Sequence, residues 1–293
     1  MDGVIVVDKP TGWTSHDVVN RMRRIAGTKK VGHLGTLDPM ATGVLPLVIG
    51  RATRLAQFFL HADKVYEATV RFGFSTNTYD IDGTPTSPEV PVHLDCDLVR
   101  RELLRFVGKI PQIPPAVSAK KIAGTPAYKL ARKNVEFELK PVEVEIYSID
   151  LLGCERADVR IRVHCGAGTY VRTIAHDLGQ LLGTGAYLAE LRRTEAGGFD
   201  LPMARTLEQL AELAAAGSLS ESLIPAAQLL PEFPSERVDA STAGFIRQGR
   251  DFRISPFRAA SGAKYVKAVG EDGELVAIGE VRLPNLYHPV LVL

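Results

Sequence analysis

The sequence predicts an α+β fold, in which a sheet with flanking helices is followed by a small, separate β module. Short runs of β-branched or alternating apolar residues indicate strands, and apolar residues recurring at helical spacing indicate helices. The stretch Pro231-Glu232-Phe233-Pro234-Ser235 interrupts these patterns and is typical of a linker. We therefore expect a larger domain at residues 1–230 and a smaller one at residues 235–293.

The N-terminal part begins with a buried strand at residues 3–7, most of which are β-branched. A turn-rich loop follows, and Ser15 is placed to cap a helix that has Val18 and Met22 on its apolar face. The opposite face is basic, with Arg21, Arg23 and Arg24. Either these charges are simply solvated, or they contact phosphates.

Residues 44–49 form an apolar run that predicts a strand, and residues 51–60 look helical. Residues 64–72 alternate between the two faces of a predicted strand, and residues 75–92, rich in Thr, Pro, Asp and Gly, predict a long loop. Asp97 is expected to cap a further helix.

Two strands are predicted at residues 142–152 and 159–165, the second with one buried face. The clearest helical period of the chain follows Gly166-Ala167-Gly168-Thr169, and Thr206 with Gln209 forms a capping box before another helix.

The C-terminal module is predicted from a hairpin pattern. Residues 265–269 and 275–281 read as strands on either side of the turn Glu271-Asp272-Gly273, and residues 290–293 read as another strand.

Composition narrows the class of protein. Hydrophobic residues make up 45% and charged residues 24%, as in a soluble globular protein. The net charge of +1 does not by itself indicate a nucleic-acid partner. However, basic residues are concentrated in residues 1–61 and 118–140, whereas residues 62–100 are acidic. The chain can therefore present a basic face.

The three cysteines, Cys96, Cys154 and Cys165, are odd in number and scattered along the chain. We therefore expect neither a disulfide nor a zinc site, which is typical of a reducing compartment. No apolar run approaches the length of a membrane span or a signal sequence, and we expect a cytoplasmic protein.

A glycine-framed loop at residues 32–43 carries a single carboxylate, Asp38, between the hydroxyls of Thr36 and Thr42. Pro39 drives Asp38 toward an extended conformation. A stiff loop of this kind suits the presentation of a reactive group. An ordinary Asp-Pro turn with glycine caps explains the same pattern, and the loop alone does not decide between them.

Several other reaction types and binding motifs are not supported, because the residues that they require are missing. A glycosidase needs two facing carboxylates, and the loop offers one. No Gly-x-Ser-x-Gly elbow is present. Residues 27–32 lack the Gly-Lys-Ser/Thr ending of a phosphate-binding loop, and Gly166-Ala167-Gly168 lacks the third glycine of a dinucleotide fingerprint.

Arg172 lies in the first turn of its predicted helix, where the helix dipole disfavours a cation. A positive helix start together with this guanidinium makes an anion site, for a phosphate or a protein carboxylate. The alternative is an exposed arginine at the edge of an amphipathic helix.

These motifs together resemble the bacterial TruB-type tRNA pseudouridine synthases. The resemblance rests on Asp8-Lys9-Pro10-x-Gly12-x-Thr14-Ser15, Gly32-His33-x-Gly35-Thr36-Leu37-Asp38-Pro39-x-Ala41-x-Gly43, Lys64-x-Tyr66, Gly168-Thr169-Tyr170-Val171-Arg172 and Leu191-Arg192-Arg193. The matches run in order over residues 3–195. The family fold that they imply is a mixed, mostly antiparallel sheet flanked by helices. The C-terminal module resembles the family's small β-barrel-like (PUA-type) RNA-binding domain more weakly.

The resemblance also implies roles for individual residues. Asp38 matches the catalytic aspartate, Tyr66 the tyrosine that stacks on the target base, and Arg172 the arginine that pairs with the aspartate. The implied substrate contacts are His33, Tyr66, Tyr170, Leu191, Lys9 and Lys121. His33 matches a residue that contacts the flipped RNA loop, whereas Lys9 and Lys121 match basic residues near the substrate backbone.

The implied reaction isomerises a uridine in the T-loop of tRNA (position 55) to pseudouridine. It needs no cofactor and no metal, because nothing is oxidised and no external group is transferred. The implied partner is the T-stem-loop, without guide RNA or membrane, and we expect a monomer. A non-catalytic tRNA-binding or tRNA-folding protein is the alternative from another class, and a nucleoside glycosidase is a third.

Overall fold

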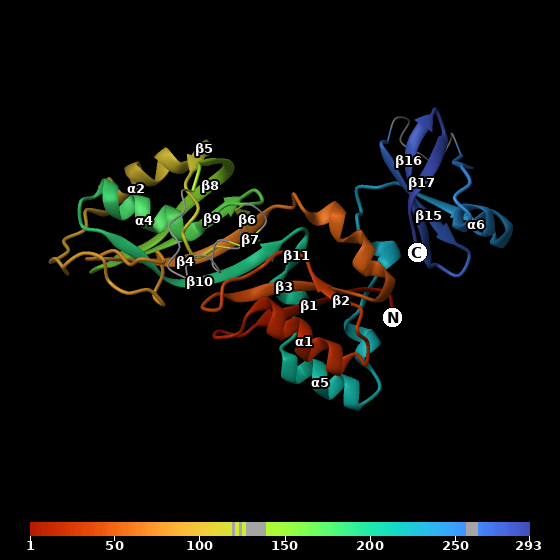
Figure 1. The fold of residues 1–293 in the computed structure, drawn as a ribbon, viewed down its shortest axis with the longest axis horizontal. Coiled ribbons are helices and arrows are strands. Elements are labelled where there is room, and N and C mark those ends of the chain that lie inside the picture. The colour runs from red at the N-terminus through yellow and green to blue at the C-terminus, as the bar shows by residue number, and fades with distance from the viewer. Residues whose placement is uncertain (119–120, 123–124, 127–138, 256–262) are drawn as a thin grey trace.

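The computed structural model describes residues 1–118, 121–122, 125–126, 139–255 and 263–293. Within these residues a large sheet carries helices, and a second sheet is formed by C-terminal residues (Figure 1). The predicted α+β class is thus confirmed. None of the described helices has the length and hydropathy needed to span a membrane.

The large sheet has the strand order β12-β1-β3-β10-β4-β9-β8-β5, with β2 beside β3 and β11 beside β10. Its neighbours pair antiparallel, except that β3 and β10 run parallel. The predicted mixed, mostly antiparallel sheet is therefore confirmed. The strands are β1 (Gly3–Lys9), β2 (Val31–His33), β3 (Thr42–Ile49), β4 (Lys64–Phe72), β5 (Gly108–Gln112), β8 (Val142–Glu155), β9 (Asp158–Cys165), β10 (Ala186–Ala196), β11 (Phe199–Asp200) and β12 (Ile224–Pro225). A separate pair joins β6 (Lys121–Ile122) to β7 (Thr125–Pro126).

Helices pack on the sheet at two places, as Figure 1 shows. There α1 and α5 pack against each other, with α1 beside β2 and α5 beside β1, whereas α2 contacts β8 and α4 packs mainly against β10 and β4. Their apolar faces join one buried cluster with the strands. The α-helices are α1 (Ser15–Ile25), α2 (Cys96–Leu103), α4 (Val171–Leu181), α5 (Leu207–Ala215) and α6 (Ala240–Arg247). Short 3-10 helices are η1 (Gly50–Phe59), η2 (Leu104–Phe106), η3 (Leu201–Met203), η4 (Leu219–Ser222) and η5 (Ala226–Gln228).

Two predicted helix caps are displaced by one or two residues. Thr14, not Ser15, caps α1, because its side chain and that of Asp17 satisfy each other's backbone N–H groups. Asp95, not Asp97, caps α2. In each case two nearby residues have suitable side chains, and only the folded backbone shows which of them caps the helix. The capping box that begins α5 is confirmed.

No strand was predicted at residues 186–196, although β10 lies in the middle of the large sheet between β3 and β4. Its sequence, AYLAELRRTEA, is rich in Ala, Leu, Glu and Arg, which are good helix formers. Its pairing with β4 along its whole length overrides that preference. Local propensity was therefore misleading here, and the tertiary environment decided the conformation.

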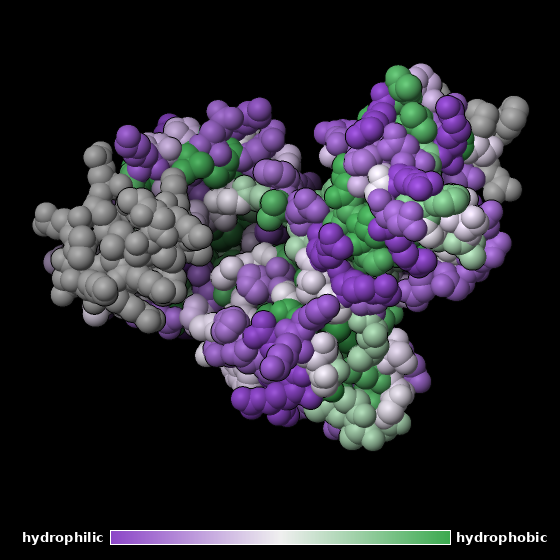
Figure 2. Space-filling view, turned by 45° about the vertical axis from the view of Figure 1, so that its right-hand side comes forward, coloured by the Kyte–Doolittle hydropathy of each residue, from purple (hydrophilic) through white to green (hydrophobic). Residues whose placement is uncertain are grey.

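The C-terminal sheet has the order β13-β15-β16-β17-β14. The predicted hairpin is formed by β15 and β16. Figure 2 shows this module as a lobe beside the larger part, with polar and apolar side chains mixed on the face in view. The curled sheet is consistent with a half-barrel. Its strands are β13 (Ser235–Val238), β14 (Phe252–Arg253), β15 (Tyr265–Gly270), β16 (Leu275–Leu283) and β17 (Leu286–Val292).

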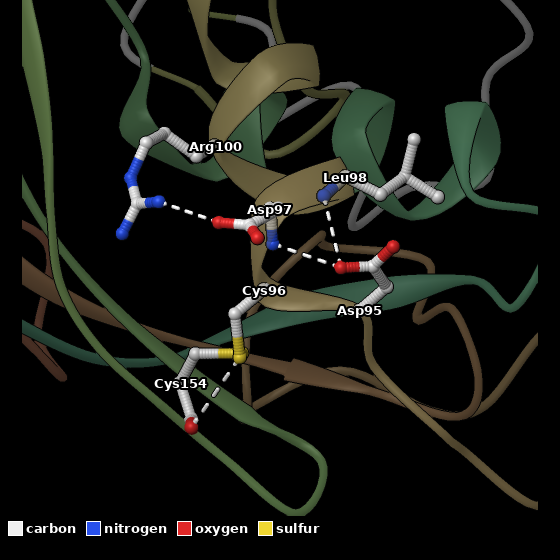
Figure 3. Close-up of a disulfide and its surroundings, with 6 residues drawn as sticks. All are labelled: Asp95, Cys96, Asp97, Leu98, Arg100 and Cys154. Carbon is white, nitrogen blue, oxygen red and sulfur yellow. Dashed lines mark hydrogen bonds and ion pairs between the residues drawn. A yellow bond between two sulfur atoms is a disulfide. The ribbon is translucent and has the colours of Figure 1, made fainter.

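The expectation that no disulfide forms was wrong, because Cys96 is bonded to Cys154. Figure 3 shows Cys96 directly after the cap residue of α2 and Cys154 on the neighbouring strand β8. The two residues are 58 positions apart in sequence, with Cα atoms 6.0 Å apart. Sequence spacing could not reveal this pairing, since only the folded chain brings the start of α2 onto β8. Cys165 is free and buried.

Candidate active site

Asp38 lies in the loop that joins β2 to β3, and both of its neighbours are fixed through their backbones. The Ser15 hydroxyl accepts a hydrogen bond from the Leu37 N–H at 2.8 Å and donates one to the Leu37 carbonyl at 3.2 Å. On the other side, the Lys9 ammonium donates to the Pro39 carbonyl at 3.2 Å. The predicted stiffness of the loop thus has a tertiary as well as a local cause.

Lys9 is fully buried and lies behind this loop. Its ammonium also donates to the carbonyls of Pro10, at 2.9 Å, and Trp13, at 2.6 Å. Burial lowers the pKa of Lys9 to about 8, and the nearby negative charge of Asp38 opposes this effect. Lys9 therefore ties the turn after β1 to the Asp38 loop.

Arg193, on β10, supports the same loop from a second direction and is also fully buried. Its guanidinium donates to the carbonyls of Val44, at 2.8 Å, and Gly35, at 3.2 Å. Gly43 allows the backbone of β3 to lie close to the backbone of Arg193. It has a φ of 100°, and a Cβ there would lie 2.2 Å from the Arg193 carbonyl oxygen. From the sequence, Arg193 was expected only as part of the Leu191-Arg192-Arg193 motif.

Arg172, in the first turn of α4, forms an ion pair with Asp38. Its Nε lies 3.0 Å from Asp38 Oδ2, and its Nη2 donates to Asp38 Oδ1 at 3.1 Å. Nη2 also donates to the Val117 carbonyl at 2.9 Å. The Arg172 side chain is only 4% exposed. The anion that the sequence placed beside this arginine is thus a protein carboxylate.

A second carboxylate, Asp80, holds the other side of this guanidinium. Arg172 Nη1 donates to Asp80 Oδ2 at 3.1 Å and to the Thr78 carbonyl at 3.2 Å. Asp80 is itself fixed, because its Oδ1 accepts from the Thr78 hydroxyl at 2.6 Å and from the Asp82 N–H at 3.2 Å. Asp80 was not expected from the sequence, where it is one residue of a polar loop. Nothing in its local sequence distinguishes it from the other acidic residues of that loop.

Asp38 opens onto a cavity of about 250 Å³. The predicted residues Tyr66, Tyr170, Arg172 and Leu191 line the same cavity. They come from β4, the cap of α4, α4 itself and β10. Lys64 and Leu60 also line it, together with residues of the segments 35–37 and 167–169. Five predicted side chains from four separate segments of the chain are thus brought together.

The carboxyl of Asp38 is balanced between opposing influences. Burial raises its pKa above the ordinary value, and the negative charge of Asp80 acts in the same direction. The Arg172 guanidinium opposes both by favouring the ionised form. The side chain remains one-third exposed, on the cavity side. Asp38 is therefore an accessible carboxylate whose charge is held by a buried partner.

Two tyrosines line the same small space. Tyr66 is 7% exposed, and burial raises the pKa of its hydroxyl. Burial likewise raises the pKa of Tyr170. Both phenols are therefore neutral at physiological pH, and their rings give the cavity flat apolar walls beside Leu191.

The remaining predicted residues lie elsewhere. His33 ends β2 and is half-buried, and burial together with the charge of Arg193 lowers its pKa. Neither His33 nor Lys9 is among the residues that line the cavity. Lys121 begins β6, but its side chain lies outside the described part of the chain.

The chemistry of this arrangement is restricted. One carboxylate, paired with a buried arginine, faces a cavity with aromatic and aliphatic walls. Such walls suit a flat, weakly polar group such as a nucleobase. Among the described residues, no group of three or more His, Cys, Asp or Glu side chains is arranged to hold a metal ion.

Comparisons with known proteins show the family of the chain. Residues 23–171 match the family model described as TruB family pseudouridylate synthase (N terminal domain). Residues 172–231 match the tRNA pseudouridylate synthase B C-terminal domain.

Curated relatives and solved structures extend the match to the whole chain. A tRNA pseudouridine synthase B of Solibacter usitatus is 61% identical over 293 residues, which is 100% of both chains. One of Thermobifida fusca is 43% identical and covers 99% of this chain and 98% of the relative. A chain from a crystal structure of a Cbf5-Nop10-Gar1 complex superposes with a TM-score of 0.73 at 27% identity, covering 98% of this chain and 83% of that one. The chain therefore belongs to the TruB family of pseudouridylate synthases and is an enzyme of the isomerase class.

Proposed function

We propose that this enzyme isomerises the T-loop uridine at position 55 of tRNA to pseudouridine. The observation that carries the proposal is Asp38, held by the buried Arg172 at the edge of a cavity with Tyr66 in its wall. The substrate is supported by the relatives, which are named tRNA pseudouridine synthase B.

The reaction breaks the N1–C1′ bond of uridine, turns the base and forms a C5–C1′ bond. C5 loses its proton and N1 gains one, so atoms balance without an oxidant or a second substrate. The Asp38 carboxylate acts at the sugar in one of two ways. It attacks C1′ as a nucleophile, or it accepts a sugar proton while stabilising positive charge at C1′.

The cavity walls have separate tasks in this proposal. Extrusion of the uridine from its stack costs a few kcal/mol, which stacking on Tyr66 offsets. Leu191 and Tyr170 exclude water and keep the detached base from escaping. Arg172 keeps Asp38 ionised and directed at the sugar. Because the cavity is small, it retains the base while leaving it room to turn.

The outer contacts are those that the family resemblance implies. His33 and Lys121 contact the opened RNA loop and its backbone. Lys9 supports the Asp38 loop from behind, as its burial requires. The module at residues 235–293 forms an RNA-binding domain after the catalytic domain at residues 1–230. We further propose that the enzyme works as a cytoplasmic monomer on the T-stem-loop, without guide RNA or cofactor.

The test is a modification assay on unmodified tRNA, in which pseudouridine is mapped at single-nucleotide resolution. We expect it at the T-loop position alone, with no free uracil, because an isomerase releases none. Released uracil would instead indicate a glycosidase. A tRNA with cytidine at that position is the matched substrate control.

Asp38→Asn should abolish turnover because the amide neither attacks C1′ nor accepts a proton. RNA affinity should stay within roughly tenfold, about 1.4 kcal/mol, since the variant keeps the shape of the side chain. Asp150→Asn, at an exposed position, is the control. Isomerisation by the Asp38 variant at a near-normal rate would show that the proposed mechanism is incorrect.

A further inference from the structure

The direction in which Arg172 points depends on the loop between β4 and α2. Two of its acceptors, the Thr78 carbonyl and the Asp80 carboxylate, both bind Nη1, at 3.2 and 3.1 Å. These two residues flank Tyr79 in the sequence. The backbone at Tyr79 therefore decides whether both acceptors reach one nitrogen of the guanidinium.

That backbone is in an unfavourable conformation. Tyr79 has a φ of 64°, in the left-handed region that side chains other than glycine adopt rarely and at a cost. Such strain persists only where surrounding contacts hold it in place, and it is often found beside functional sites. The contacts that hold Tyr79 thus hold the acceptors of Arg172 as well.

The main side-chain contact is a stack between the rings of Tyr79 and His176. Their centroids lie 3.8 Å apart, and their planes differ by 13°. His176 lies on α4, four residues after Arg172, and hence one turn further along the same helix face. The stack therefore fastens the strained loop to the helix that carries the active-site arginine.

Backbone hydrogen bonds to β10 also hold this loop in place. The Tyr79 carbonyl accepts from the Leu188 N–H of β10 at 2.9 Å, and the Leu188 carbonyl accepts from the Ile81 N–H at 3.0 Å. No residue that the structure describes gives His176 Nδ1 a hydrogen bond. The His176 ring is thus held by packing, and its face against Tyr79 is its main contact to the loop.

We propose that the stacked rings of Tyr79 and His176 are positioning residues for the reaction, which hold Thr78 and Asp80 so that Arg172 points at Asp38. The inference rests on the proposed role of Asp38. Without the stack, the loop loses its side-chain anchor on α4, and the two acceptors of Arg172 are no longer held in position. A displacement of about 1 Å near a reacting group lowers the rate by roughly 10²-fold.

Three substitutions of Tyr79 distinguish the effect of its aromatic ring from the effect of its strained backbone. Tyr79→Phe keeps the ring and should keep kcat within about threefold. Tyr79→Ala and Tyr79→Gly remove the ring and should lower kcat roughly 10- to 100-fold, with KM and tRNA affinity within about threefold. Glycine adopts a positive φ freely, so it is the matched control for strain. A Tyr79→Gly enzyme with normal kcat would overturn the proposal.

A double-mutant cycle tests whether the two rings act as a unit. His176→Ala combined with Tyr79→Ala should cost no more than either change alone, because each removes the same stack. His176→Phe, which keeps a flat ring, should restore most of the rate. If the two losses multiply in the double variant, the rings act independently and the proposal fails.

A measurement without turnover completes the test. In ¹⁵N-arginine-labelled enzyme, the Nε–Hε resonance of Arg172, assigned with Arg172→Lys, should shift in Tyr79→Ala and Tyr79→Gly but not in Tyr79→Phe. Thermal unfolding of each variant shows that the fold is kept. An unchanged resonance in both ringless variants would overturn the inference.

The outcome with Asp38→Asn distinguishes this inference from the proposed function. If Asp38→Asn remains active, the proposed function fails whatever the Tyr79 variants do. If Asp38→Asn is inactive but Tyr79→Ala keeps full kcat, only the present inference fails.

Discussion

At the residue scale, the site depends on charges that are buried and paired. Arg172 binds two carboxylates. Lys9 and Arg193 are fully buried, and their side chains donate hydrogen bonds to backbone carbonyls in and around the Asp38 loop. Burying a cation is unfavourable unless acceptors surround it. These cations are therefore supports for the one carboxylate that faces the cavity.

The cost of burying the Lys9 ammonium should appear as a pH dependence of the free energy of unfolding. The pKa of Lys9 is about 8 in the folded protein and near 10.5 in a solvated lysine. Between these values the unfolded chain binds more protons, so stability rises with pH. This contribution is complete above about pH 10.5 and is lost as the pH falls through about 8.

We expect Lys9→Met to flatten that rise when the free energy of unfolding is measured in urea from pH 7 to 10.5. One proton accounts for at most about 1.4 kcal/mol per pH unit. Lys29→Met, at an exposed position, is the control and should leave the slope unchanged. An identical slope in wild type and Lys9→Met would contradict the assignment.

At the element scale, the site forms where β3 and β10 run side by side in parallel. The Asp38 loop leads into β3, whereas Leu191 and Arg193 belong to β10. This one parallel pairing places the carboxylate of one strand's loop beside the cavity wall of the other. Each strand alone would expose its residues without bringing them together.

A substitution at Gly43 tests the close approach of β3 to β10. Gly43→Ala places a Cβ 2.2 Å from the Arg193 carbonyl oxygen and requires a φ of 100°. We expect a loss of about 2 kcal/mol or more in the free energy of unfolding. Gly244→Ala is the matched control. Its Cβ meets nothing within 4 Å and it lies within α6, so it should be neutral or slightly stabilising. Equal stability of the two variants in thermal unfolding would refute the argument.

The disulfide joins two other elements, α2 and β8. It closes a span of 58 residues, and bonds of this kind typically stabilise by about 2–4 kcal/mol. We expect reduction to lower the unfolding temperature while kcat is kept, because neither cysteine lines the cavity. The same reductant should not affect a Cys96→Ser, Cys154→Ser double variant. A reductant-insensitive wild type would show that the bond does not form.

At the scale of the whole molecule, the C-terminal sheet is joined to the larger part by a shared apolar cluster. Ile278 and Leu291 of the small sheet are buried in the same cluster as Val4 and Leu55 of the large part. Aromatic rings of Phe58 and Tyr265 meet edge to face across this boundary. The two sequence regions are therefore packed together rather than tethered loosely.

We expect the two parts to unfold in one calorimetric transition. Leu291→Ala, which removes side-chain packing from the shared cluster, should lower that transition as a whole by about 2–5 kcal/mol of stability. Val290→Ala, at an exposed neighbouring position, is the control. Two separate transitions, with only the smaller shifted by Leu291→Ala, would show that the parts unfold independently.

By itself, the sequence indicated the class of fold, the positions of several longer strands, and Asp38 and Arg172 as unusual residues. These follow from local patterns, because glycine, proline and apolar periodicity act over a few residues. Tyr66 was indicated only by the family resemblance. The unfavourable place of Arg172 at a helix start indicated an anion site without identifying the anion, and its pairing with Asp38 was implied by the resemblance.

Tertiary structure alone decided the rest. The strand β10, the disulfide, the acid Asp80 and the stack on His176 all join segments that are distant in sequence. Their residue types are locally ambiguous: helix formers lie in a central strand, and polar residues of a loop become buried ligands. Only chain packing removes their water and supplies their partners. That is the physical reason why one aspartate in a glycine-framed turn becomes the charged edge of a cavity.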